Sequence, residues 1–148
     1  MMADVTIRVL IADDDPAVRR VLKIFLADTG DMVVIGEAGS GREAMEMLER
    51  LSPDVALIDC TMADFDCVEA VRLMEARGDD VGIVVLDTYG ARALAAVEAG
   101  ASAYLLKEAL RERLLETVRR SATSSSDKPA RDARKGAPDS TPRQTESD

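Results

Sequence analysis

Residues 8–20 read RVLIADDDPAVRR, and this stretch passes from an apolar run through three consecutive aspartates to a proline. The solid apolar run is typical of a strand that is covered on both faces. Asp15 followed by Pro16 predicts the start of a helix, because an aspartate caps free N–H groups and proline fits the first helical position. The stretch therefore predicts a buried strand, an acidic turn and a helix, in that order.

The same alternation continues along the chain. Four further apolar runs follow, with the sequences MVVIGEA (32–38), DVALID (54–59), VGIVVLD (81–87) and SAYLL (102–106). Segments with helical periodicity separate them, as in the spacing of Val18, Val21, Leu22, Phe25 and Leu26. Five strands that alternate with five helices predict a doubly wound α/β fold of flavodoxin type, built on one five-stranded parallel sheet.

Composition limits the function classes. The 148 residues carry a net charge of −9, which argues against a nucleic-acid surface or an anionic membrane as partner. The chain contains no histidine, so histidine catalysis and most zinc sites are excluded. No apolar run approaches membrane-spanning length and no signal peptide is recognised, so we expect a cytoplasmic protein. Two cysteines make no disulfide framework in a chain of this length, so we expect Cys60 and Cys67 to be reduced thiols.

The end of the chain differs from the rest. Residues 121–148 contain no Leu, Ile, Val, Met or aromatic residue, and they hold three of the five prolines. Such a segment cannot bury enough apolar surface to offset the entropy of ordering. We therefore expect a folded domain over residues 1–121 and a disordered polar tail over residues 122–148.

Charged residues follow several of the predicted strands. Asp13 and Asp14 end the first strand, Asp59 the third and Asp87 the fourth, and Lys107 follows the fifth. Ligands of doubly wound sheets bind outside the carboxyl ends of the strands, so these residues should meet at one edge. Clustered carboxylates repel one another unless a cation offsets them, and oxygen ligands suit Mg²⁺. The edge therefore predicts a magnesium site.

Asp59 has a second candidate role at this edge. A carboxylate can act as a nucleophile and hold an aspartyl phosphate where cations neutralise the incoming charge. Lys107 is the natural partner of the phosphoryl group. Phosphoryl transfer is therefore the chemistry that these residues suggest.

At this point the sequence resembles the receiver domain of two-component response regulators, over about residues 6–120. VLIADDDPAVRR is similar to the acidic segment after the first strand, which implies metal-binding roles for Asp13 and Asp14. DVALIDCTMADFD is similar to the phosphoacceptor segment, which implies that Asp59 is the acceptor and a metal ligand. By the same pattern, Thr61 lends its main-chain carbonyl to the metal.

AGASAYLLKE resembles the segment around the fifth strand of the family. The resemblance implies a switch aromatic at Tyr104 and a lysine that contacts the phosphoryl group at Lys107. Glu108 follows Lys107, where other receivers have proline, and this is more similar to the NarL/FixJ branch.

Three positions depart from the family pattern. Asp87 stands where the family has a switch threonine or serine, and Thr88 follows it one residue later. A carboxylate there would repel the phosphoryl group, and presenting Thr88 instead would need the strand to turn over by one residue. Ala63 and Cys67 replace a proline and a glycine in the loop beside Asp59.

The main hypothesis is a stand-alone receiver, a signalling domain rather than an enzyme. It would take a phosphoryl group from a sensor histidine kinase or phosphotransfer protein and signal through the face of the fourth helix, fifth strand and fifth helix. That face could also form a homodimer. The second hypothesis is a pseudo-receiver that binds partners without phosphorylation. A third is a haloacid-dehalogenase-type phosphatase, with Asp13 as nucleophile and Asp15 as acid/base.

Overall fold

The computed structural model describes residues 6–126, in which five parallel strands form one sheet in the order β2-β1-β3-β4-β5. The predicted fold class is confirmed. The structure places every strand where an apolar run predicts one: β1 (Ile7–Ala12), β2 (Met32–Ala38), β3 (Val55–Asp59), β4 (Gly82–Asp87) and β5 (Ala103–Leu106).

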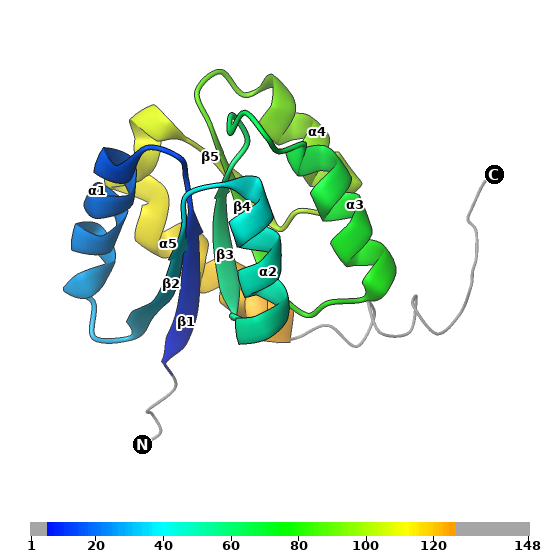
Figure 1. Ribbon diagram of the computed structural model, residues 1–148. Helices are drawn as coiled ribbons and strands as arrows, with labels where there is room; N and C mark the ends of the chain where they lie inside the picture. Colours follow the sequence, from blue (N-terminus) through cyan, green and yellow to red (C-terminus); the bar gives the residue numbers. More distant parts are fainter. Residues whose placement is uncertain (1–5, 127–148) are drawn as a thin grey trace.

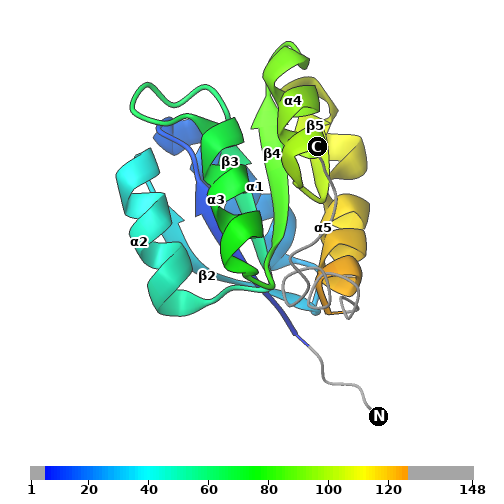
Figure 2. The same ribbon diagram turned by 90° about the vertical axis from the view of Figure 1, so that its right-hand side faces the viewer.

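Five α-helices connect the strands and cover both faces of the sheet (Figure 1). Helices α1 and α5 lie on one face, and Figure 2 shows α3 between α2 and α4 on the other. A short 3₁₀ turn, Lys107–Ala109, precedes α5. The helices are α1 (Pro16–Ala27), α2 (Gly41–Leu51), α3 (Cys67–Arg77), α4 (Ala91–Ala99) and α5 (Leu110–Ser126).

The core is aliphatic and consists of two clusters, one on each face of the sheet. On one face, Leu22 and Leu26 of α1 and Leu114 of α5 pack against the sheet. On the other, Leu48 of α2 and Val71 of α3 do so. Strands β3 and β4 are buried along their whole length, which explains why their sequences are apolar without alternation.

Strand register places the charged residues at one edge. Asp59 pairs with Leu86 across β3 and β4, and Asp87 pairs with Leu106 across β4 and β5. Because all strands are parallel, their carboxyl ends share the upper edge in Figure 1. Helix α1 begins beside that edge as predicted, with the side chain of Asp15 accepting a hydrogen bond from the Ala17 N–H at 2.9 Å.

Helix α5 continues to Ser126, five residues beyond the predicted boundary at residue 121. Ser121 is almost fully buried, and Ala122 packs against the core cluster of α1 and α5. Serine and threonine have modest helix propensity, so the packing of Ser121 and Ala122 explains the continuation of the helix better than propensity does. Most of the predicted tail, residues 127–148, lies outside the described residues. Within residues 6–126, no helix is long and apolar enough to cross a membrane.

Candidate functional site

Two buried carboxylates and one lysine form the centre of the site. Asp13 follows β1 and Asp59 ends β3, and both are wholly buried. The Nζ atom of Lys107 lies 3.2 Å from Oδ2 of Asp13 and 3.3 Å from Oδ2 of Asp59. One ammonium group therefore bridges the two carboxylates from the end of β5.

A third carboxylate completes the cluster. Oxygen atoms of Asp13, Asp14 and Asp59 lie within 4.8 Å of one another, and Asp14 is exposed to solvent. Oδ2 of Asp13 is buried, and beyond its ion pair with Lys107 it has no hydrogen-bond partner among the described residues. Three oxygen donors, one buried without a hydrogen bond and one open to solvent, are a donor set that fits a hard divalent cation.

Burial and the neighbouring charges shift the pKa values of Asp13 and Lys107. Burial raises the pKa of the Asp13 carboxyl, and the Asp59 charge raises it further, against the opposing effects of the Asp15 N–H and Lys107. Burial alone would lower the pKa of Lys107, but the charges of Asp59 and Asp13 outweigh it and raise that pKa. The lysine is therefore held as a cation, and its single charge does not balance the three carboxyl groups of the cluster.

Thr61 holds the Asp59 carboxylate in place. Its backbone N–H donates to Oδ1 of Asp59 at 3.0 Å, and its hydroxyl lies 2.8 Å from Oδ1 and 3.0 Å from Oδ2. Both oxygens of Asp59 are thus engaged from the residue two positions later. These contacts come from the N–H and the hydroxyl of Thr61, and the role of its main-chain carbonyl as a metal ligand stays a prediction.

Arg19 supports the site and was not anticipated from the sequence. From α1, its Nη1 donates to the Asp13 carbonyl at 2.7 Å, and its Nε pairs with Glu37 at 3.2 Å. The Asp15 N–H donates to Oδ1 of Asp13 at 2.9 Å. An arginine on a half-exposed helix face looks like an ordinary surface residue in a single sequence, so nothing there indicates this role.

Asp87 is the last residue of β4 and is buried, whereas Thr88 is exposed. Its Oδ1 accepts from the Thr88 N–H at 2.8 Å, and its Oδ2 accepts from the Ala93 N–H at 3.1 Å. Gly90, at the N-cap position of α4, provides no side-chain cap, so Asp87 caps the helix. Its carboxylate is therefore directed to the start of α4 and does not belong to the three-carboxylate cluster.

The prediction of free thiols is wrong. Cys60 and Cys67 form a disulfide, with Cα atoms 5.2 Å apart. Two cysteines cannot form a disulfide framework for a whole domain, but their number does not exclude a local bridge. The loop after β3 folds back onto the first residue of α3, which brings two cysteines seven positions apart within bonding distance.

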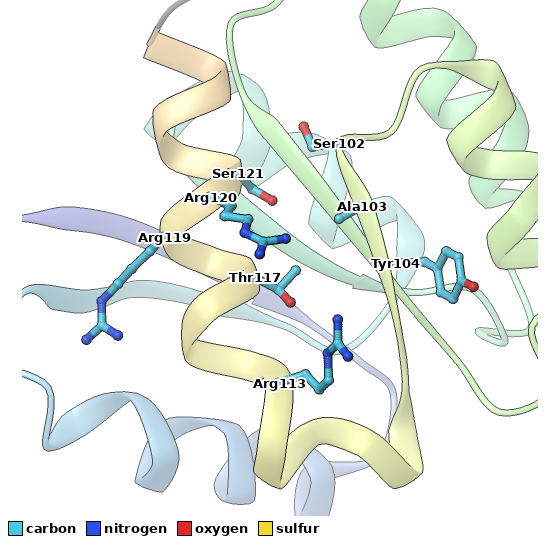
Figure 3. Close-up of a pocket in the computed structure, with 8 residues that line it drawn as sticks. All are labelled: Ser102, Ala103, Tyr104, Arg113, Thr117, Arg119, Arg120 and Ser121. Carbon is cyan, nitrogen blue, oxygen red and sulfur yellow. The ribbon is translucent and has the colours of Figure 1, made fainter.

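The predicted switch residue Tyr104 lies apart from the cluster. It is 44% exposed on the edge strand β5, and in Figure 3 its ring projects from β5 on the side away from α5. A cavity of about 660 Å³ lies between β5 and α5, and Arg113 and Arg120 line it. This edge of the sheet is therefore open and carries arginine side chains, in contrast to the buried cluster.

Comparison with known proteins gives a consistent assignment. The family model described as the response regulator receiver domain matches residues 9–119. Over 112 residues the chain is 37% identical to the uncharacterized transcriptional regulatory protein YhcZ of Bacillus subtilis, covering 74% of this chain and 52% of that protein. It is also 37% identical over 115 residues to the transcriptional regulatory protein LiaR of the same organism, covering 76% and 54%.

Solved structures agree. The response regulator domain of Thermotoga maritima CheB superposes with a TM-score of 0.73 at 28% identity, covering 80% of this chain and 97% of that one. The receiver domain of the putative response regulator NarL from Mycobacterium tuberculosis superposes with a TM-score of 0.72 at 25% identity, covering 84% and 100%. The chain spans about half the length of the curated relatives it matches.

Proposed function

Since this chain belongs to the response regulator receiver domain family, we propose that it accepts a phosphoryl group on Asp59 in a magnesium-dependent reaction. The phosphoryl donor would be a sensor histidine kinase or a phosphotransfer protein of the cytoplasm. The observation that carries this proposal is the pair of buried carboxylates, Asp13 and Asp59, bridged by Lys107. Receiver domains of transcriptional regulators are signalling domains rather than enzymes in general, and the proposal keeps to that class.

The chain's own groups suit the transfer. An oxygen of Asp59 attacks phosphorus while the bond from phosphorus to the donor's imidazole nitrogen breaks, and an acyl phosphate forms. Lys107, whose pKa is raised by Asp59 and Asp13 against the effect of burial, stays charged and can pair with the incoming phosphoryl oxygens. Thr61 fixes the orientation of the Asp59 carboxylate before the reaction.

We assign the metal to Asp13, Asp14 and Asp59, with the carbonyl of Thr61 as a further ligand. A bound Mg²⁺ ion supplies charge neutralisation for the transferred phosphoryl group. Oδ2 of Asp13 supports this assignment, because this buried oxygen has an ion pair with Lys107 but no hydrogen bond among the described residues, which leaves it able to accept a cation.

Signalling is proposed to leave the domain through the α4–β5–α5 face, read by a downstream protein or a second copy of the chain. Large apolar side chains are exposed there: Leu94 of α4 is 54% exposed and Tyr104 of β5 is 44% exposed. The inner face of α4 buries only alanines, Ala93 and Ala96, so displacing the helix costs little apolar contact. Phosphorylation that shifts α4 would alter a surface a partner can read.

Asp87 is the observation that favours the second candidate, a pseudo-receiver that binds partners without phosphorylation. It occupies the switch position at the end of β4 with a negative charge, and that charge opposes a phosphoryl group. Its engagement with the N–H groups of Thr88 and Ala93 partly neutralises it. We keep Asp87 as the atypical switch residue, with Thr88 as the alternative.

Intact-mass measurement after incubation with Mg²⁺ and acetyl phosphate tests the proposal. We expect the mass of one added phosphoryl group in wild type and none in Asp59→Asn. Asp87→Thr should raise the phosphorylated fraction severalfold by removing the charge. A wild type that never gains mass, while binding partners normally, would establish the pseudo-receiver. Hydrolysis of phosphate esters by wild type, abolished in Asp13→Asn, would establish the phosphatase. The structure does not favour that candidate, because Asp15, its acid/base residue, caps α1.

A further inference from the structure

The loop after β3 is closed by a covalent bond that the proposed reaction does not use. Cys60 directly follows the acceptor Asp59, and Cys67 is the first residue of α3. Both side chains are almost fully buried. The disulfide therefore ties the residue next to the acceptor to the beginning of a helix.

The closed loop also carries the contacts that connect the acceptor to its surroundings. Thr61 holds the Asp59 carboxylate, as described above. Asp64 accepts hydrogen bonds from the N–H groups of Gly41, at 2.9 Å, and Arg42, at 3.4 Å, at the start of α2. Whatever fixes or frees this loop acts on the acceptor and on α2 together.

A cavity of about 450 Å³ borders the bridge, lined by both cysteines and by Arg92 of α4. Nη1 of Arg92 donates to the Cys60 carbonyl at 2.9 Å, so the guanidinium group lies in the cavity wall next to the disulfide. Asp66 also lines the cavity, so the cavity presents one cation and one carboxylate. A cavity of this size admits a small molecule, and the two opposite charges favour a zwitterion.

We propose that Cys60–Cys67 is a reversible thiol–disulfide exchange site, and that its reagent is a small zwitterionic thiol, with carboxylates for Arg92 and an ammonium group for Asp66. Disulfides in reducing compartments are usually redox-responsive rather than structural, and the proposed cytoplasmic function places this one there. The cavity and Arg92 supply the second, independent indication of a ligand.

The exchange consumes two molecules of thiol. The first, as thiolate, attacks the Cys60 sulfur, forms a mixed disulfide and releases Cys67 as thiolate, which then takes up a proton. Cys67 is the leaving group in this scheme because it is the first residue of α3, where the helix dipole favours a thiolate, although the Asp66 carboxylate already accepts from the Glu69 N–H of the same turn. The second thiol displaces the first from Cys60, so the protein gains two thiols and the reagent becomes a disulfide. Burial of both sulfurs makes the exchange slow.

The consequence for signalling rests on the proposed function. In the oxidised chain the ring keeps Thr61 on Asp59, so the metal and phosphoryl site is formed before ligands arrive. Reduction frees the loop, and binding must then order it again. We expect reduction to weaken Mg²⁺ binding and to slow phosphorylation by acetyl phosphate roughly two- to tenfold.

The test begins with the thiols alone. Wild type is equilibrated in glutathione buffers of graded thiol-to-disulfide ratio, alkylated and analysed by peptide mass. We expect residues 60 and 67 to pass together from protected to alkylated within the range of cellular buffers. A bridge that stays intact throughout that range would overturn the proposal.

The second arm compares Mg²⁺ affinity, read as the shift of the melting temperature, in oxidised and reduced wild type. The double variant Cys60→Ser, Cys67→Ser is the matched control and should match the reduced protein with no response to glutathione. Equal Mg²⁺ affinities in the two redox states would overturn the coupling. Redox-dependent Mg²⁺ binding in a protein that never accepts phosphoryl would refute the proposed function and leave this inference standing.

Discussion

The loops that follow β3 and β4, on either side of the proposed acceptor Asp59, are built in opposite ways. The loop after β3, residues 60–66, is held by the disulfide, by the Thr61 contacts to Asp59 and by Asp64 at α2. The loop after β4, residues 88–90, carries Tyr89, which is 91% exposed, and leads to a helix packed through alanines. The difference suggests that one side of the site is a fixed frame and the other side is the part that responds.

We expect the largest effect from a change at Lys107, which pairs with both buried carboxylates of the site. Lys107→Met leaves Asp13 and Asp59 buried beside each other without a counter-charge. We expect the free energy of unfolding to fall by about 2–4 kcal/mol in urea titrations without metal, and Mg²⁺ to restore part of the loss.

Lys23→Met is the matched control, because Lys23 pairs with Glu37 at the surface. This variant should lose less than about 1 kcal/mol. Equal losses in the two variants would show that Lys107 does not compensate a buried charge.

The fixed side can be disturbed at Gly41, where α2 meets the loop. A Cβ atom there would lie 2.3 Å from Cδ1 and 2.5 Å from Cβ of Phe65, so the loop must shift. Gly41→Ala should lower the free energy of unfolding by about 1–3 kcal/mol and weaken Mg²⁺ binding. In the control Gly39→Ala, the nearest atom is Nη1 of Arg19, at 3.3 Å, so only the end of one side chain must give and the loss should be smaller. An unchanged free energy of unfolding in Gly41→Ala would mean that the loop after β3 can shift without cost and is not a fixed frame.

The responsive side can be disturbed at Asp87. Asp87→Ala removes the acceptor of the Ala93 N–H, so we expect a loss of about 1–2 kcal/mol and faster hydrogen exchange in the first turn of α4. Asp87→Asn keeps one acceptor oxygen and should lose less. Unchanged exchange in both variants would mean that α4 does not depend on this cap.

The smallest effect is expected at the end of the chain. A chain that stops after Ser126 keeps every described residue, and its melting temperature should match the full chain, within about 0.5 kcal/mol in stability. A chain that stops after Thr117 loses Val118, which is fully buried, and should be clearly less stable. Equal stability of all three chains would place the end of the core before residue 118.

The sequence predicted the sheet and the main cluster because both depend on patterns along the chain. Apolar runs ending in aspartate, at Asp13 and Asp59, are local signals, and parallel topology alone brings them together. The direction of the Asp87 carboxylate depends on where α4 begins, and the Cys60–Cys67 bond depends on how a loop folds back. The last turn of α5 depends on packing of the preceding turn. The hydrophobic periodicity of the sequence predicts none of these three features.

Hydrogen-exchange mass spectrometry of the oxidised protein, with Mg²⁺ present and with or without acetyl phosphate, tests the comparison most directly. Asp59→Asn serves as the control that cannot be phosphorylated at the proposed acceptor. In wild type, we expect acetyl phosphate to change the exchange of peptides covering residues 88–106 and to leave peptides covering residues 60–67 unchanged. In Asp59→Asn, we expect no change in either region. A change confined to residues 60–67, or the same change in Asp59→Asn, would contradict the comparison.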